Sequence, residues 1–144
     1  EATRNGTLNA SGAIISNAVR TCHYPDHISW YYRCDQAGIY LMAETNLETH
    51  DHAEDGSNRA SWNVPGNIEC WRACTLDRAV SNFETFKNHT SVLFWSLGNE
   101  SYAGNVLREM NQYYKEKRSG QTGTGKDGDF GCEYCEQHTF LLCR

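Results

Sequence analysis

The sequence predicts an α/β fold with parallel strands. The unbroken apolar run at residues 39–43 and the segment 91–96, which is apolar between its two terminal serines, are typical of strands that are buried on both faces of a sheet. Between them, apolar residues recur at steps of three and four from residue 68 to 86, which indicates an amphipathic helix of about 20 residues. Strands that alternate with helices in this way are typical of parallel βαβ units. The 144 residues fit one domain of ordinary size.

The first elements are short. Residues 1–16 are polar and weakly patterned, so we expect an irregular lead-in there. Residues 17–20 are a strand candidate, and the turn sequence His23-Tyr-Pro-Asp26 follows it. A helix is expected to begin near Ile28 and to end at Gly38, because glycine accepts the positive φ that closes many helices.

The last elements lead into a different kind of sequence. Val106, Met110 and Tyr113 mark one face of a helix that follows the run at 91–96. Residues 119–131 hold five glycines in thirteen positions without periodicity, which is typical of a linker. We therefore expect an α/β domain over 17–118 and a Gly/Cys-rich tail over 119–144.

Composition excludes several classes of protein. The formal net charge is −5, which argues against a surface for nucleic acid or for an acidic membrane. No apolar run approaches the roughly 20 residues that span a bilayer, and the first residues show no signal-peptide pattern. Seven cysteines, an odd number, fit a complete disulfide framework poorly and favour a reducing compartment. We expect a cytoplasmic protein.

Polar side chains gather just past the end of each predicted strand. In parallel α/β folds the loops at this edge converge and form the active site. They are Arg20 and His23 after the first strand, Glu44, Asn46, Glu48 and His50 after the second, and Asn99 and Glu100 after the third.

These residue types suggest a specific chemistry. Glu48 and His50 are alternate residues, so in extended backbone their side chains point the same way and can share a divalent ion. Glu100 can reach the same edge, and a glutamate with its pKa raised by burial is a suitable general acid for a poor leaving group such as a sugar oxygen. Asn99 can donate a hydrogen bond to a substrate hydroxyl.

Three motifs closely resemble the catalytic domain of bacterial β-galactosidases in glycoside hydrolase family 2. They lie at residues 17–26 (NAVRTCHYPD), 35–50 (DQAGIYLMAETNLETH) and 91–101 (SVLFWSLGNES), in the order that the family has them. The resemblance runs from about residue 17 to 117. It implies part of a (β/α)₈ TIM barrel, roughly its strands 2–4 with their helices, and a hydrolase of terminal β-galactosides such as lactose.

The resemblance also implies roles for single residues. Glu100 matches the general acid/base of a retaining mechanism, and Asn99 matches the residue that binds the sugar 2-hydroxyl. Glu48, His50 and Glu100 match the ligands of an active-site Mg²⁺. His23 matches the histidine that stabilises the transition state, with Arg20 supporting it. The metal pair and the Cys-His-Tyr-Pro stretch favour galactosidase over β-glucuronidase and β-mannosidase, and the intact enzyme is expected to be a homo-oligomer.

The length of the chain limits what it can do alone. A closed barrel needs about 200–250 residues, and a retaining glycosidase needs a second carboxylate as nucleophile. Glu133, in Cys132-Glu-Tyr134, echoes the family's nucleophile, but the 33 positions after Glu100 are too few for the intervening βα units. We therefore expect a fragment that lacks the nucleophile and is inactive alone.

The tail offers an alternative from another class. Cys132, Cys135, His138 and Cys143 resemble a zinc knuckle with a shortened second gap, which would make the chain a non-catalytic zinc-binding module. Stoichiometric zinc that is lost with Cys135 would favour this alternative over the glycosidase.

Overall fold

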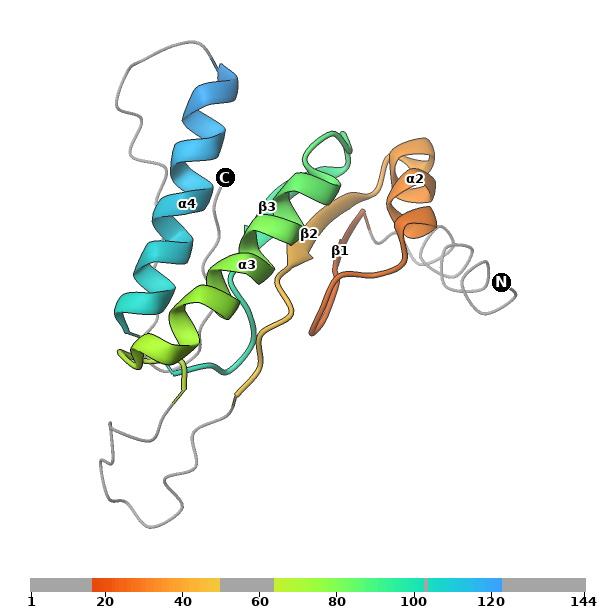
Figure 1. Ribbon diagram of the computed structural model, residues 1–144. Coiled ribbons are helices and arrows are strands. Elements are labelled where there is room, and N and C mark those ends of the chain that lie inside the picture. The colour runs from red at the N-terminus through yellow and green to blue at the C-terminus, as the bar shows by residue number, and fades with distance from the viewer. Residues whose placement is uncertain (1–16, 50–63, 103, 123–144) are drawn as a thin grey trace.

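The computed structural model describes residues 17–49, 64–102 and 104–122. Within these ranges three strands and three helices alternate along the chain (Figure 1): β1 (Ala18–Arg20), α2 (Ile28–Ala37), β2 (Tyr40–Glu44), α3 (Glu69–Phe86), β3 (Val92–Ser96) and α4 (Asn105–Thr122). The strands form one parallel sheet in the order β1-β2-β3. The predicted α/β fold with parallel strands is confirmed.

The ends of α2 follow from local sequence. At its start the side-chain Nδ1 of His27 accepts a hydrogen bond from the backbone N–H of Ser29 at 3.2 Å, which satisfies one of the free donors of the first turn. At its end Gly38 has φ of 68° and its N–H bonds to the carbonyl of Cys34. The predicted stop at Gly38 is therefore correct, and β2 begins two residues later.

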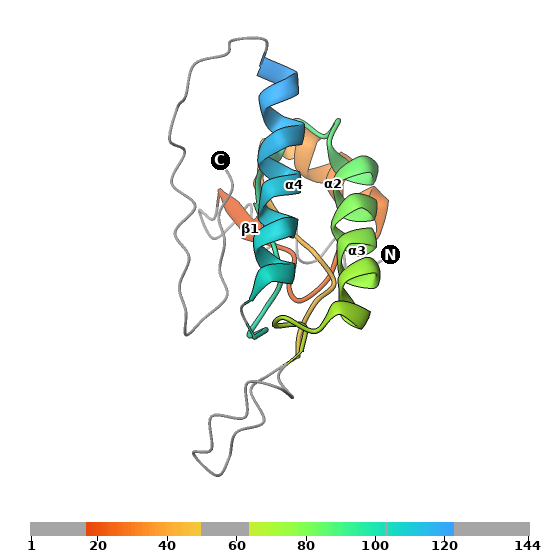
Figure 2. The ribbon, with the colours of Figure 1, turned by 60° about the vertical axis from the view of Figure 1, so that its left-hand side comes forward.

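Helices α3 and α4 run side by side, as both views show (Figures 1 and 2). Arg72 on α3 forms an ion pair with Glu109 on α4 at 2.5 Å. Helix α4 continues to Thr122 and so includes the first residues of the stretch that the sequence assigns to a tail. A single glycine in a helix, here Gly120, lowers the stability of the helix by only about 1 kcal/mol relative to alanine, so the helix can continue through it. No helix among the described residues is both long and apolar enough to cross a membrane.

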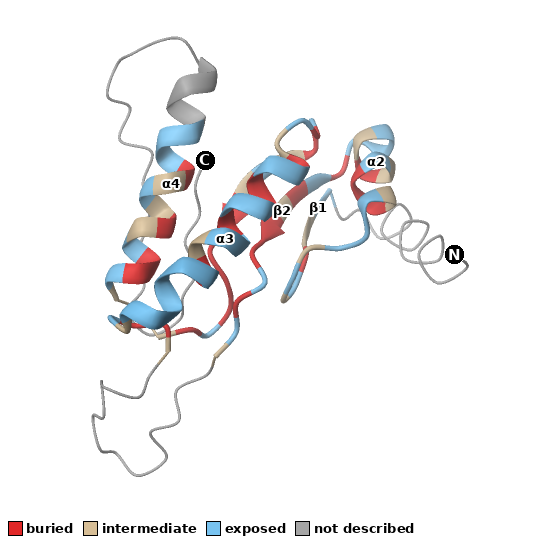
Figure 3. Ribbon diagram, in the orientation of Figure 1, coloured by how far each residue is buried: buried red, intermediate tan, exposed pale blue. Residues whose placement is uncertain are grey.

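The core lies where the helices pack on β2 and β3 (Figure 3). Leu41 and Ala43 of β2 are fully buried. The ring of Tyr31 stacks on Phe86 with centroids 3.8 Å apart, and Trp95 stacks on Tyr114 at 5.5 Å. These aromatic contacts tie α2 to α3 and β3 to α4.

The strands are less buried than the sequence predicts. Tyr40 at the start of β2 is 49% exposed, and Leu93 on β3 is 38% exposed. The expectation of burial on both faces is therefore wrong at these positions. The physical reason is that the described sheet has only three strands, so its ends and its second face have less cover than those of a closed barrel.

Candidate functional site

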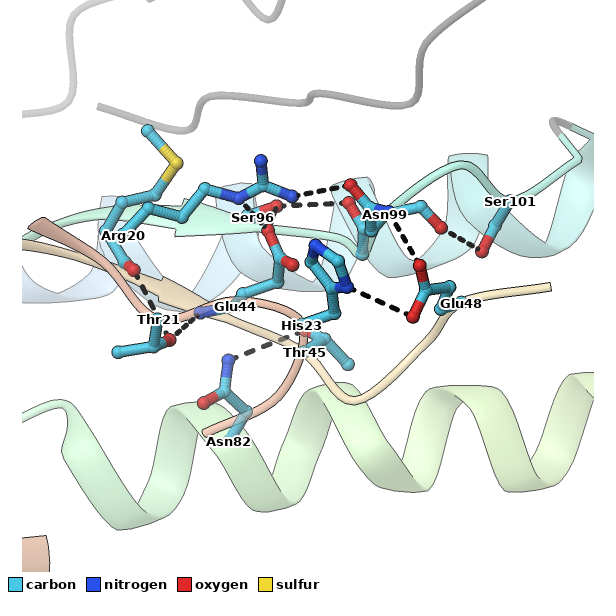
Figure 4. A network of polar contacts seen from close by, with 12 residues as sticks. Arg20, Thr21, His23, Glu44, Thr45, Glu48, Asn82, Ser96, Asn99 and Ser101 are labelled. Carbon is cyan, nitrogen blue, oxygen red and sulfur yellow. Dashed lines mark hydrogen bonds and ion pairs between the residues drawn. The ribbon is translucent and has the colours of Figure 1, made fainter. Parts of the chain in front are cut away.

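The site lies at the carboxyl ends of the three strands. Arg20, Glu44 and Ser96 are the last residues of β1, β2 and β3. Because the strands are parallel, these ends meet at one edge of the sheet, and Glu44 is directly opposite Ser96 in the register. Glu44 lies on the face opposite that of Ala43, because side chains alternate along a strand. Figure 4 shows the polar contacts that result.

Glu44 is a buried carboxylate with two donors on one oxygen. Its side chain is completely shielded from solvent. Its Oε2 accepts hydrogen bonds from Arg20 Nε and, at 2.9 Å, from Ser96 Oγ. The backbone N–H of Glu44 donates to Thr21 Oγ1 at 2.9 Å. A buried charge requires such partners, because its desolvation is costly. Its second oxygen, Oε1, has no hydrogen-bond partner among the described residues.

Arg20 carries the network from Glu44 to Asn99. Its Nη2 donates to Asn99 Oδ1 at 2.9 Å, and Asn99 Nδ2 donates to Glu48 Oε1 at the same distance (Figure 4). Glu48 Oε2 lies 3.1 Å from His23 Nδ1. Side chains from all three strand-end loops therefore form one continuous row from Glu44 to His23.

The backbone holds the two loops of this row together. Glu48 and Asn99 form an isolated parallel bridge, in which the Asn99 N–H donates to the Leu47 carbonyl at 2.8 Å. The close approach requires glycine at position 98, since a Cβ there would lie 2.5 Å from the Leu47 oxygen. A loop from strand β2 and one from β3 therefore meet at van der Waals distance.

Glu100 directly follows this bridge. Its φ of 38° is positive, which is uncommon for a residue with a side chain, and no other described non-glycine residue shares it. Ser101 Oγ donates to the Asn99 carbonyl at 3.0 Å, and Tyr102 forms a second bridge with Pro65. Glu100 is exposed, so it lacks the burial that the sequence reasoning attaches to a general acid, while its neighbours are held in place. Such a strained position at a polar edge is typical of functional sites.

A second polar cluster connects the end of β2 to the helices. Asn82 on α3 donates to Tyr114 OH at 3.2 Å and to Thr45 Oγ1 at 3.4 Å. Thr45 Oγ1 and Tyr114 OH lie 2.8 Å apart. These three buried side chains fix the loop that begins at Thr45 and leads to Glu48.

The structure describes only some of the predicted metal ligands. Glu48 and Glu100 are described, whereas His50 lies outside the described residues. In the described part of the chain, no group of three or more His, Cys, Asp or Glu side chains is placed to hold a metal ion. The predicted zinc ligands Cys132, Cys135, His138 and Cys143, and the nucleophile candidate Glu133, also lie outside the described residues. These parts stay predictions.

The structure brings together three of the predicted residues, His23, Glu48 and Asn99, and places Glu100 next to them in the chain. It also adds residues whose part in the site the sequence does not predict. Glu44 was visible as an acid at the end of an apolar strand, but nothing in the pattern shows that it is buried against Arg20. Ser96 and Ser101 carry no signal in the sequence, because serine is common at strand ends and in turns.

Comparison with known proteins adds a family to this geometry. Residues 8–121 match the family described as glycosyl hydrolases family 2, TIM barrel domain. The chain is 67% identical over 102 residues to the β-galactosidase large subunit of Latilactobacillus sakei. The aligned segment is 70% of this chain and 16% of that protein. The chain is 59% identical over 101 residues to the large subunit of Leuconostoc lactis (69% and 16%). It is 54% identical over 102 residues to a β-galactosidase of Clostridium acetobutylicum (70% and 11%).

Proposed function

Since this chain belongs to the glycosyl hydrolase family 2 TIM-barrel domain family, we propose that it carries the acid/base half of a β-galactosidase active site. The reaction is the hydrolysis of terminal non-reducing β-D-galactosides, such as lactose, with retention of configuration. One observation carries the proposal. The contact of Asn99 Nδ2 with Glu48 Oε1 at the carboxyl end of a parallel sheet brings together the amide proposed to bind the sugar and a carboxylate proposed to hold Mg²⁺, directly beside Glu100 in the chain.

Glu100 is the general acid and base in this proposal. It protonates the departing glycosidic oxygen and later removes a proton from the attacking water. Its exposed position supports the role, because a substrate must reach the carboxyl group. The bridge at Asn99 and the hydrogen bond of Ser101 fix the backbone on both sides of Glu100. That fixed backbone supports the precise placement that proton transfer requires.

Asn99 and His23 bind the sugar in this proposal. The Asn99 carboxamide donates to the 2-hydroxyl, an interaction that strengthens in the transition states of glycosidases. The His23 imidazole contacts the galactose as charge develops on the ring. The His23 side chain is 41% exposed and its Nδ1 faces Glu48, so the rest of the ring is open to a ligand.

Mg²⁺ is the proposed cofactor, held by Glu48, His50 and Glu100. The carboxylates among these donors fit the ion in kind, since Mg²⁺ prefers oxygen ligands and is often held by one or two carboxylates. The Glu48 side chain is 31% exposed, so its carboxylate is accessible from solvent. When bound, the ion would supply positive charge that stabilises negative charge at the leaving-group side.

The nucleophile is proposed to come from outside the described residues. The chain covers 16% or less of the three relatives named above, and a retaining mechanism needs a second carboxylate about 5–5.5 Å from the first. Two of these relatives are named large subunits, which favours a parent that assembles with a different subunit over the expected homo-oligomer. We keep the cytoplasm as the proposed location.

A chimera tests the function. In the Latilactobacillus sakei large subunit, the segment that aligns with this chain is replaced by this chain's own sequence, and the result is called the chimera. We expect it to hydrolyse a chromogenic β-galactoside, in the presence of whatever companion subunit the unmodified protein needs. Glu100→Gln should lower kcat for lactose by roughly 100-fold or more, whereas Glu69→Gln, an exposed carboxylate on α3, should not change it.

The same chimera tests which class of sugar is the substrate. The proposal requires faster turnover of the β-galactoside than of the matching β-glucuronide or β-mannoside. A folded chimera that prefers either of these sugars, or that keeps its activity on lactose without Glu100, would contradict the proposal.

A further inference from the structure

Glu44 raises a question that fold stability does not answer. The Glu44 carboxylate is fully buried and its partner Arg20 is 24% exposed; such a largely buried ion pair is weak evidence for stability, because replacing one with apolar residues is often neutral or stabilising. The pair lies at the edge of the sheet that carries the site, and neither residue contacts the proposed substrate in the proposal above. Another role explains the pair better.

We propose that Glu44 is a positioning residue that fixes the carboxamide of Asn99 through Arg20. Arg20 is the shared member, because its Nε bonds to Glu44 Oε2 and its Nη2 bonds to Asn99 Oδ1. The guanidinium group is planar and rigid, so an anchor on Nε also fixes the direction of Nη2. Glu44 therefore acts on Asn99 without touching it.

The consequence for Asn99 is a single orientation of its amide. With Oδ1 facing Arg20, Nδ2 faces Glu48 and donates to Oε1 at 2.9 Å. The flipped amide would place Nδ2 against the guanidinium and Oδ1 against the Glu48 carboxylate, so both contacts would become repulsive. The buried carboxylate thus determines which end of the Asn99 side chain faces Glu48 and which faces Arg20.

Ser96 supports the anchor from the other side. Its hydroxyl donates to the same Oε2 atom of Glu44 at 2.9 Å and holds the carboxylate in position for Arg20. Among the described residues, only the Oε2 atom of Glu44 accepts hydrogen bonds, so this one oxygen holds both Arg20 and Ser96. We call the chain of contacts from Glu44 through Arg20 to Asn99 the relay. Its role in sugar binding rests on the proposed function, but the contacts themselves do not.

The test uses NMR on the full ¹⁵N-labelled chain and needs no activity. Two signals report the relay: hydrogen exchange at Arg20 Nε–H and the Asn99 carboxamide resonances. Glu44→Met removes both acceptor oxygens at similar volume. Because a hydrogen bond to a charged group contributes at least about 1.5 kcal/mol, exchange at Arg20 Nε–H should become roughly tenfold faster. The Asn99 resonances should shift in the same direction as in Arg20→Lys.

The conservative variant and a matched control separate positioning from general loosening. Glu44→Gln keeps one acceptor, so both signals should change less than in Glu44→Met. Asp35→Asn removes another hydrogen-bonded carboxylate, at the opposite end of the sheet beside Ser91. It should lower stability and leave the Asn99 resonances in place.

Three results would overturn the proposal. The Asn99 resonances could stay unchanged in Glu44→Met while Arg20→Lys moves them, or Asp35→Asn could move them equally. If Glu44→Met does not fold, the unmutated chain still decides, because unprotected exchange at its Arg20 Nε–H contradicts the anchor. A chimera without galactosidase activity would contradict the proposed function alone, so the two failures are distinguishable.

Discussion

Asn99 and Glu48 are 51 positions apart in the sequence, yet Asn99 Nδ2 donates to Glu48 Oε1 at 2.9 Å and their backbones form a bridge. The contact links the loop after β2 to the loop after β3. It therefore makes one unit of two segments that the sequence shows only as separate motifs, and Glu100 is attached to that unit.

The side-chain amide of Asn99 should be essential for the β-galactosidase activity of the chimera. In Asn99→Asp a carboxylate oxygen replaces the Nδ2 donor and faces the Glu48 carboxylate, so attraction becomes repulsion. We expect kcat/KM for a β-galactoside to fall by roughly 100-fold. Steady-state kinetics measure this effect. Asn88→Asp, an exposed asparagine in the turn before β3, is the matched control and should be neutral.

Gly98 should tolerate no side chain. A Cβ at this position would lie 2.5 Å from the Leu47 oxygen and 2.9 Å from the Leu47 Cβ, so the bridge must open. Gly98→Ala should lower the free energy of unfolding by at least about 2 kcal/mol. Gly38→Ala is the comparison, because its φ is also positive but nothing lies within 4 Å of its Cβ. It should cost only about 1 kcal/mol, and equal losses in urea denaturation would count against the tight contact.

Asp35 links α2 to the start of β3. Its Oδ1 accepts from the Ser91 N–H at 2.8 Å, and its Oδ2 lies 2.6 Å from His89 Nδ1. Partial burial raises the pKa of the Asp35 carboxyl, but the hydrogen bonds from Ser91 and His89 outweigh it, so the pKa lies below its ordinary value. The carboxylate therefore stabilises the fold at pH values above the unfolded-state pKa of about 3.9.

Acid should remove this contribution. As the pH falls below about 4 and through the lowered pKa, the folded carboxyl becomes protonated and its stabilising effect is lost. At neutral pH, Asp35→Asn should be less stable than the unmutated chain by about 2 kcal/mol. The difference should shrink as the pH approaches 3. Urea titrations at several pH values measure it, and a difference that is constant from pH 7 to 3 would refute the role of the charge.

The isolated chain should not turn over β-galactosides. A retaining mechanism needs a nucleophile that the described residues do not supply in this account, and no covalent intermediate can form without it. Release of chromophore by the 144-residue chain, with or without Mg²⁺, should equal that of its Glu100→Gln variant. Turnover that depends on Glu100 would mean that a second carboxylate is present, and Glu133 would become the first candidate.

The sequence predicts the elements of this fold well, for physical reasons. The apolar runs at 39–43 and 92–95 are too short for a typical helix, which favours strands, and the glycine at 38 marks the end of α2. The sequence overestimates the burial of Tyr40 and Leu93, because a local pattern does not contain the number of neighbouring strands. Cover of a strand is a property of the whole sheet.

The sequence predicts which polar residues lie at this edge of the sheet but not the hydrogen bonds between them, and their functional roles stay predictions. His23, Glu48 and Asn99 meet as the three motifs imply. The burial of Glu44 could not be predicted, since an acid at a strand end looks the same whether it faces solvent or an arginine 24 positions earlier. The positive φ of Glu100 also has no local signal, because no glycine marks the position.

The most direct measurement compares two leaving groups in the chimera with and without Glu100→Gln. Lactose needs a proton on its departing oxygen, whereas dinitrophenolate leaves without one, and kcat/KM reports the first bond-breaking step. If Glu100 is the acid, kcat/KM for lactose should fall by roughly 1,000-fold, and that for dinitrophenyl β-galactoside should fall by less than about tenfold. Equal falls for both substrates would contradict the claim that this chain carries the general acid of the site.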